Sequence, residues 1–110
     1  MKRVPNINPD QYGEKASVFS LQKGKLPPQA VDLEEVVLGA MMIDKKGVDE
    51  VIDILQPEAF YKESHQLIFN AIISLFEKQE PIDIKTVSFQ LKKDGNLNSV
   101  GGDYYLIELS

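Results

Sequence analysis

A run of apolar residues from Val36 to Ile43, VVLGAMMI, is the strongest hydrophobic signal in the chain. A membrane-spanning helix needs about 20 apolar residues, and this run is flanked by Glu35 and Asp44, so it is too short to cross a bilayer. Protein must therefore cover it. Either the helix lies at the centre of a small domain and is buried on more than one face, or part of it is kept for a partner.

The sequence predicts a first helix from about Pro28 to Ile43. Proline suits the first turn, and Asp32, Glu34 and Glu35 place negative charge near the positive end of the helix dipole. Gly39 costs about 1 kcal/mol relative to alanine in a helix interior, which is best offset by a second helix packing closely there. The apolar positions cover most of the circumference and so favour a central helix: Leu33, Val36, Val37, Leu38, Ala40, Met41, Met42 and Ile43.

Two further amphipathic helices are predicted on either side of Pro57. After a polar break at residues 44–47, apolar residues follow the i, i+3, i+4, i+7 spacing of a surface helix that ends before Pro57: Val48, Val51, Ile52 and Leu55. A longer helix is predicted from Glu63 to Gln79. Its broad apolar stripe consists of Ile68, Phe69, Ile72, Ile73, Leu75 and Phe76.

The fourth predicted helix has clear signals at both ends. Asp83 follows Pro81 and can accept hydrogen bonds from the first-turn amides, Lys92 and Lys93 suit the negative end of the dipole, and Gly95 supplies a left-handed stop. A last helix follows Gly101 and Gly102 and carries Tyr104, Tyr105, Leu106, Ile107 and Leu109. It reaches Ser110 without a closing signal, which indicates a cut chain. No segment alternates with period two for long enough to predict a strand.

These signals predict an all-α fold, a compact orthogonal bundle of about five helices formed by residues 27–110. Residues 1–26 contain scattered apolar residues, two prolines and two glycines, so we expect a flexible, disordered N-terminal tail. The tail carries five basic and two acidic residues, a net charge of +3, whereas residues 27–110 carry seven lysines and fifteen acids, a net charge of -8. The alternative to a tail without a specific role is that its positive charge docks on the acidic domain or on a nucleic acid. Such an acidic surface repels phosphate and favours a protein partner.

Compartment and membrane signals are few. The chain has no cysteine, which excludes disulfide scaffolds and thiolate metal sites. The first 13 residues, MKRVPNINPDQYG, lack the apolar core of a signal peptide, so we expect a cytoplasmic protein without a membrane anchor.

No residue pattern predicts a catalytic, metal or cofactor site. His65 is the only histidine, and its neighbour Ser64 points about 100° away on a helix, so the pair is not a nucleophile with its base. We expect His65 to pack against the core with one nitrogen hydrogen-bonded. Asp49, Glu50 and Asp53 are predicted to face solvent, and no glycine-rich loop fits a phosphate.

One surface pattern predicts partner binding. Lys85, Phe89, Lys92 and Lys93 share the face of the fourth helix opposite its buried stripe, placing an aromatic ring among lysines. Such a patch can stack a base or receive an acidic partner. The alternative is that a neighbouring segment of the same chain covers Phe89.

Four blocks of residues, in order, strongly resemble the N-terminal domain of bacterial DnaB-type replicative DNA helicases. The match runs from about Pro28 to Ser110. The blocks are Val37–Asp44 (VLGAMMID), Phe60-Tyr61 with His65 and Ile68-Phe69, Pro81-Ile82-Asp83 with Thr86-Val87, and Gly101-Gly102 with Tyr105-Leu106 and Glu108-Leu109.

The resemblance implies a non-catalytic helical collar that is joined to an ATPase motor in the full-length protein. In that family these domains pair within a hexameric ring and receive the C-terminal domain of primase, so we expect primase, other helicase subunits and possible loader proteins as partners, and DNA only through the full-length ring. Neither the helical hairpin that pairs the domains nor the motor is within these residues, so ATP and Mg²⁺ are expected only elsewhere. Ala30 stands where the family often has a polar cap.

The matched residues are predicted to be structural and none is catalytic: Gly39, His65, Phe69, Asp83, Gly95, Gly101 and Gly102. Partner contacts are predicted at Lys85, Phe89, Lys92, Lys93 and Tyr104. The first functional hypothesis is an assembly domain of a replicative helicase that recruits primase. The alternative is a free-standing nucleic-acid-binding module that uses the basic tail and the Lys85, Phe89, Lys92 and Lys93 patch.

Overall fold

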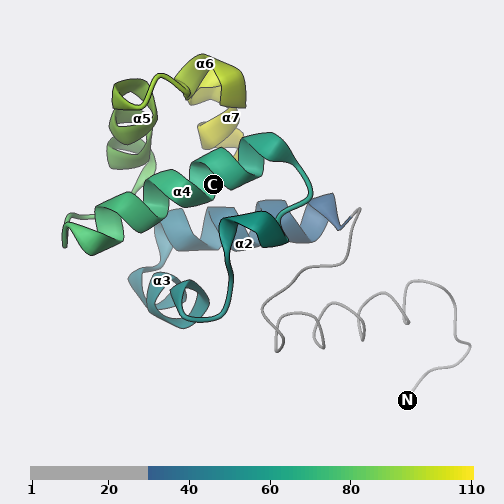
Figure 1. Ribbon diagram of the computed structural model, residues 1–110, viewed down its shortest axis with the longest axis vertical. Coiled ribbons are helices and arrows are strands. Elements are labelled where there is room, and N and C mark those ends of the chain that lie inside the picture. The colour runs from purple at the N-terminus through teal and green to yellow at the C-terminus, as the bar shows by residue number, and fades with distance from the viewer. Residues whose placement is uncertain (1–29) are drawn as a thin grey trace, which may run out of the picture.

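The computed structural model of the protein describes residues 30–110, and the predicted tail, residues 1–26, lies outside them. Within residues 30–110 every regular element is helical, which confirms the predicted fold class (Figure 1). The elements are α2 (Val31–Ile43), α3 (Lys45–Ile52), the short 3-10 helix η1 (Pro57–Ala59), α4 (Glu63–Glu77), α5 (Ile84–Lys93), α6 (Leu97–Val100) and α7 (Gly102–Leu109).

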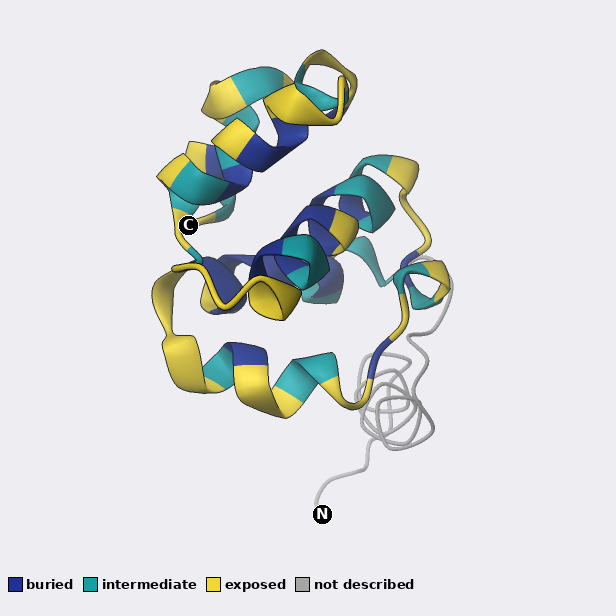
Figure 2. Ribbon diagram, turned by 60° about the vertical axis from the view of Figure 1, so that its left-hand side comes forward, coloured by how far each residue is buried: buried dark blue, intermediate teal, exposed yellow. Residues whose placement is uncertain are grey.

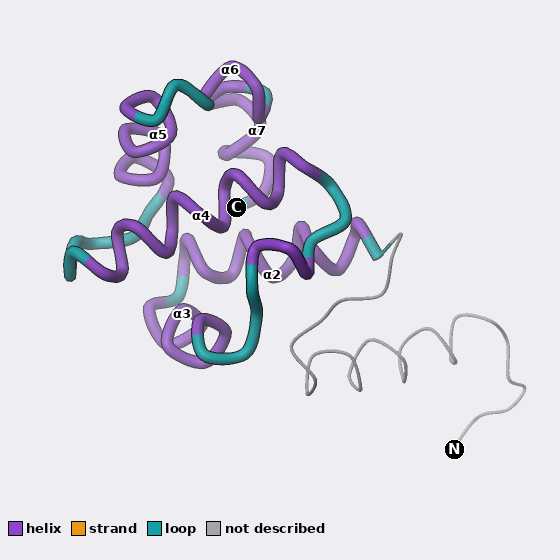
Figure 3. Tube along the Cα trace, in the orientation of Figure 1, coloured by secondary structure: helices purple, strands orange, loops and turns teal. Residues whose placement is uncertain are grey.

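Helix α4 is the centre of the bundle. It packs against α2, α5, α6 and η1, while α2 also packs against α3 and α7. The tube in Figure 3 shows short connections between helices, with α3 and α5 running across the direction of α4. Contacts between these helices bury one continuous apolar core, formed by Leu38, Met41, Met42, Val48, Leu55, Phe60, Ile68, Phe69, Ala71, Ile72, Leu75, Val87, Leu91, Val100 and Leu106.

Helix α2 is only partly covered, whereas the sequence favoured a central helix with apolar positions over most of its circumference; α4 takes the central place instead. Leu38, Gly39, Met41 and Met42 are buried, but Val36 and Ile43 are 66% and 67% exposed. Ala40 is exposed as well. The reason is geometric: among the described residues, α3, α4 and α7 pack against one side of α2 and leave the other side open, and Figure 2 shows the buried stretches gathered where the helices face one another.

The ends of the first two helices also differ from the sequence prediction. Helix α2 begins at Val31, and Ala30 gives no side-chain cap. Helix α3 begins at Lys45, inside the predicted polar break, because the Asp44 carboxylate accepts a hydrogen bond from the Lys46 amide at 2.9 Å. Helix α3 ends at Ile52, so Leu55 is buried from a loop.

Helices α4 and α5 stop in the same way but with different residues. In each helix, the residue two positions after the C-cap donates its backbone amide to the carbonyl five residues earlier. These hydrogen bonds run from Glu80 to Leu75 after α4 and from Asn96 to Leu91 after α5. The residue just before each donor has a left-handed backbone. After α5 it is Gly95, as predicted, with φ of 79°, and after α4 it is Gln79, with φ of 60°. A glutamine there is less favourable than a glycine because its Cβ crowds the following carbonyl.

Two features of the second half were missed or misplaced by the prediction. The four-residue helix α6 lies in the segment 96–101, which was predicted to be a connection, because a single turn is too short to show a period. Phe76 was placed in the buried stripe of the third helix but is 38% exposed, since α5 covers α4 from another side.

The N-cap at Asp83 allows a direct stability test. Its carboxylate accepts from the Thr86 amide at 2.8 Å, and the Thr86 hydroxyl accepts from the Asp83 amide at 2.9 Å. We expect Asp83→Ala to lower the free energy of unfolding by about 1 kcal/mol, because it leaves a first-turn amide without a partner. Urea unfolding measures this change. Asp83→Asn keeps an acceptor oxygen and is the matched control, expected to lie close to the parent protein; an equal loss in both variants would contradict the capping role.

Candidate functional site

A carboxylate buried in the core is the most unusual polar group among the described residues. Glu34, on α2, has no solvent exposure. Its Oε2 accepts from the Tyr61 amide at 2.7 Å, and its Oε1 accepts from the His65 ring at 2.7 Å and lies 3.4 Å from the Lys62 amide. Burial of an ionised carboxylate is costly, so these donors are what makes it tolerable.

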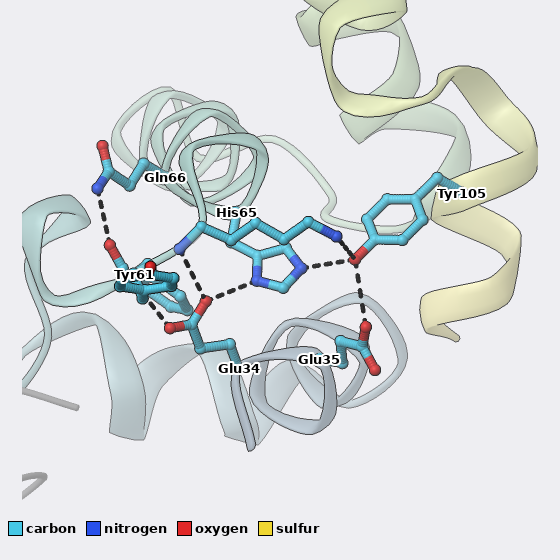
Figure 4. A network of polar contacts seen from close by, with 8 residues as sticks. Glu34, Glu35, Tyr61, His65, Gln66 and Tyr105 are labelled. Atoms are coloured by element: carbon cyan, nitrogen blue, oxygen red, sulfur yellow. Dashed lines mark hydrogen bonds and ion pairs between the residues drawn. The ribbon is translucent and has the colours of Figure 1, made fainter. Parts of the chain in front are cut away.

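His65, on α4, is held at both ring nitrogens and is fully buried (Figure 4). Nδ1 contacts Glu34, and Nε2 lies 2.6 Å from the Tyr105 hydroxyl. Because an ionised carboxylate can only accept, the network assigns the hydrogen to Nδ1, and a neutral ring then accepts from Tyr105 through Nε2. His65 thus packs in the core with both ring nitrogens hydrogen-bonded, where the sequence analysis expected one.

Tyr105, on α7, closes this network at the protein surface. Its ring stacks on the His65 ring with 5.9 Å between centroids, and its hydroxyl lies 3.5 Å from both Lys62 Nζ and a Glu35 oxygen. A tyrosine hydroxyl has one hydrogen, and the short contact to His65 takes it, so Glu35 acts mainly through its charge.

Burial, and next the negative charge of Glu35, raise the pKa of Tyr105 from 10.0 to about 12. The polar contact with Glu35 and the charges of Glu108 and Glu34 act in the same direction. The neutral hydroxyl is therefore favoured in the folded state relative to the unfolded state.

This pKa predicts a pH dependence of stability. The contribution of the neutral Tyr105 hydroxyl to the free energy of unfolding is fully present below pH 10, where folded and unfolded chains both keep the proton. It is lost as the pH rises through 12. We expect the free energy of unfolding of the parent protein to fall more steeply between these values than that of Tyr105→Phe. Absorbance titration of tyrosinate should also lose its highest step in Tyr105→Phe. Identical slopes for the two proteins would contradict the assignment.

The Glu34, His65 and Tyr105 network joins three helices that are far apart in sequence. Glu34 and His65 are separated by 31 positions, and His65 and Tyr105 by 40. Both nitrogens of His65 are taken by protein groups, so the ring has no free position for a substrate. The neighbouring Ser64 hydroxyl is buried without a hydrogen-bond partner, so it makes no hydrogen bond to His65. The arrangement fixes α2, α4 and α7 relative to one another.

Sequence reasoning missed Glu34 and Tyr105 as members of one site. Glu34 was interpreted only as a charge at the helix dipole. It precedes the buried residues Leu38 and Met41 by four and seven positions, so it shares their face of the helix, and this spacing was the available signal. Tyr105 carried no signal of its own, because its partners come from other helices.

The predicted partner-binding residues lie on two helices. Lys85, Phe89, Lys92 and Lys93 are all exposed on one face of α5, and Phe89 is 71% exposed, so no described segment covers it. Tyr104 is 72% exposed but belongs to α7. The Ser88 hydroxyl donates to the Asp103 carboxylate and links these two helices.

The residues predicted to be structural lie in the core or at helix ends. Phe69 is buried and packs on Phe60 with 5.0 Å between ring centroids. Gly101, with φ of 107°, separates α6 from α7, and a Cβ there would lie 2.9 Å from the Tyr105 Cβ. Gly102 has φ of 72° and opens α7. At Gly39 a Cβ would lie 2.1 Å from the Leu109 carbonyl oxygen, so α7 makes the close approach.

Residues 30–110 contain neither a membrane span nor a metal-binding cluster. No helix there is long and apolar enough to cross a bilayer. No group of three or more histidine, aspartate or glutamate side chains in this range is arranged to hold a metal ion.

Comparison with known proteins gives consistent matches. The profile of the DnaB-like helicase N-terminal domain matches residues 26–110. The chain is 47% identical over 89 residues to the replicative DNA helicase DnaB of Rhodothermus marinus, covering 81% of this chain and 10% of that protein. It is 38% identical over 86 residues to the replicative DNA helicase DnaB of Geobacillus stearothermophilus, covering 78% and 19%. The chain thus spans a fifth or less of these relatives.

A solved structure has the same fold. The crystal structure of the N-terminal domain of DnaB helicase from Mycobacterium tuberculosis superposes with a TM-score of 0.73 at 38% identity, covering 76% of this chain and 59% of that one. Sequence and fold therefore agree over the same region, and the chain belongs to the DnaB-like helicase N-terminal domain family.

Proposed function

We propose that this domain is a non-catalytic assembly domain of a replicative DNA helicase, which contributes to hexamer formation and recruits primase. The family match over residues 26–110 carries the proposal. ATP and Mg²⁺ would then act in a motor domain of the full-length protein, and a loader protein is a further partner. DNA would be engaged by the assembled ring.

The surface of the domain supports an interaction role. Large apolar side chains are exposed on four different helices, at Val36 and Ile43 on α2, Phe76 on α4, Phe89 on α5, and Tyr104 and Ile107 on α7. Single exposed apolar residues are common, but a set of this size distributed over helix faces is typical of a protein that binds others. The net charge of -8 on residues 27–110 also favours protein partners over phosphate backbones.

A binding experiment with primase tests the proposal. Full-length helicase is expected to retain the C-terminal domain of its cognate primase in a pull-down, and Tyr104→Ala is expected to weaken this binding at least tenfold. Tyr61→Ala, which removes an exposed tyrosine from a different surface, is the matched control and should bind like the parent protein. Absence of binding to full-length helicase would overturn primase recruitment.

Subunit assembly is tested separately by light scattering. Full-length protein with residues 1–110 deleted is expected to form fewer or less stable hexamers than the intact protein at the same subunit concentration. Equal hexamer populations over a dilution series would show that this domain does not contribute to assembly.

A second candidate function, nucleic-acid binding, is favoured by one observation. Phe89 is exposed among Lys85, Lys92 and Lys93, the arrangement that stacks a base beside a phosphate. Under this hypothesis single-stranded DNA binds with a strong salt dependence, and Phe89→Ala removes about 1–3 kcal/mol of binding free energy. Fluorescence anisotropy measures both effects, with Tyr61→Ala as control. Unchanged DNA affinity in Phe89→Ala would remove this candidate.

A further inference from the structure

A groove of about 740 Å³ lies between the beginning of α3 and the end of α4, away from the Glu34, His65 and Tyr105 network. Its apolar lining includes Val48 and Ile82, together with the exposed side chains of Ile43 and Phe76. We call it the acidic groove, because three of the four charged residues that line it are acidic: Asp49, Glu77 and Glu80, against Lys45.

The wall of the acidic groove contains the one non-glycine residue with positive φ among the described residues. Gln79 has φ of 60° and lies in this lining, at the position where α5 uses Gly95. Glutamine is the less stable choice for this conformation, so a side chain is kept here at a cost in folding stability. A long amide side chain at the edge of a groove can bind the backbone of an extended segment.

The N-terminal segment of the same chain has the chemistry that fits this groove. Val18, Phe19 and Leu21 are apolar and are flanked by Lys15, Lys23 and Lys25. An apolar centre with basic flanks complements an apolar groove with an acidic rim. A basic segment also matches this acidic rim better than another acidic surface does, and residues 27–110 themselves carry a net charge of -8.

The length of the connection also permits this contact. The described chain starts at Ala30, at the beginning of α2, and the groove includes Ile43 at the other end of that helix, about 20 Å away at 1.5 Å per residue. The nine residues from Leu21 to Ala30 reach up to about 30 Å when extended. Tethering also raises the local concentration of the segment to the millimolar range.

We propose that the N-terminal segment around Val18, Phe19 and Leu21 docks in the acidic groove between α3 and the end of α4. The apolar side chains cover Ile43 and Phe76, and the flanking lysines lie near the carboxylates of Asp49, Glu77 and Glu80. A partner that uses the same groove has to displace this segment first. The proposal is independent of primase binding, since it concerns contacts within one chain.

Disulfide trapping in the 110-residue protein tests the proposal directly, because the chain contains no cysteine. Ser20→Cys is combined with Gln79→Cys at the groove, or with Glu63→Cys at the start of α4. Glu63 is the stringent control because it lies near the point where the tail joins α2. Its neighbour Lys62 has its amide 3.4 Å from Glu34 Oε1, and Glu34 is one helical turn from Ala30. A free tail would therefore reach position 63 at least as fast as position 79.

The expected result is an intramolecular disulfide that forms at least tenfold faster with Gln79→Cys than with Glu63→Cys, after each rate is corrected for the thiol's reactivity toward a small disulfide. Adding Phe19→Asp or Ile43→Asp should remove the preference, and 0.5 M NaCl should reduce it. The pair Ser20→Cys and Lys45→Cys repeats the test at another residue of the groove and leaves the left-handed Gln79 unchanged. Equal rates at positions 79 and 63 would overturn the proposal, as would disulfide-linked dimers in place of the intramolecular bond.

Discussion

Glu34→Ala is expected to destabilise the domain by about 3–5 kcal/mol, the sum of two unsatisfied buried donors and a cavity, and the largest effect we expect of any single polar substitution in this protein. The carboxylate is fully buried and accepts from the Tyr61 amide and from His65. Its removal leaves these buried donors without a partner and opens a cavity between α2 and α4. The cost comes mainly from the groups left behind, since each buried donor that loses its acceptor costs about 1–3 kcal/mol.

Urea unfolding followed by circular dichroism measures this loss. Asp32→Ala removes an acidic residue from the exposed side of the same helix and is the matched control, expected to cost less than about 1 kcal/mol through the helix dipole alone. Glu34→Gln preserves the side-chain volume but turns one acceptor into a donor, so we expect an intermediate loss. A loss below about 1 kcal/mol for Glu34→Ala would mean that the buried donors find other partners.

A double-mutant cycle separates the interaction between Glu34 and His65 from their separate contributions. If the two side chains stabilise α2 and α4 mainly through each other, Glu34→Ala and His65→Ala together should cost clearly less than the sum of the single losses. Simple additivity would show that the backbone amides of residues 61 and 62 carry most of the effect.

Gly39→Ala is expected to destabilise the domain by about 1–3 kcal/mol, although alanine is the better helix former. A Cβ at this position would lie 2.1 Å from the Leu109 carbonyl oxygen, a backbone atom of α7 that has to move. This steric cost exceeds the gain of about 1 kcal/mol from helix propensity. Amide exchange should show the loss of protection first in α7, because α7 must shift away from α2.

Gly47→Ala provides the matched control with the opposite sign. Gly47 lies in α3, and a Cβ there would make only an ordinary van der Waals contact, 3.6 Å from the Ala40 carbonyl oxygen. We expect this variant to be more stable than the parent protein by up to about 1 kcal/mol. Thermal and urea unfolding of the two alanine variants compare the same chemical change in two surroundings. A stabilised Gly39→Ala protein would contradict the close approach of α7.

Local signals account for most of the fold that the sequence predicted. The cap at Asp83, the stop at Gly95 and the apolar spacing of the residues in α3, α4 and α5 each depend on neighbours within one or two helical turns. Such signals can be identified from the sequence because they do not depend on how distant segments pack. The four-block resemblance added the family, which the comparisons bear out.

The candidate site could be predicted only in part. His65 was expected to pack with a hydrogen bond, but its partners Glu34 and Tyr105 come from helices 31 and 40 positions away. Only the four-residue spacing between Glu34 and Leu38 indicated that Glu34 is buried. The favourable position of Glu34 near the positive end of the helix dipole explained the same residue more simply. The exposure of Phe89 was also undecided from sequence, because a neighbouring segment could have covered it.

By itself the sequence determined that this protein is all-α, where most of its helices begin and end, and which family it resembles. Tertiary structure decided which parts of VVLGAMMI are covered, which helix fills the space beside Gly39, and what surrounds the carboxylate of Glu34. The physical reason is that helix formation is decided by contacts within a few residues, whereas burial depends on which helices pack together. The half-exposed α2 and the fully buried Glu34 both follow from that packing.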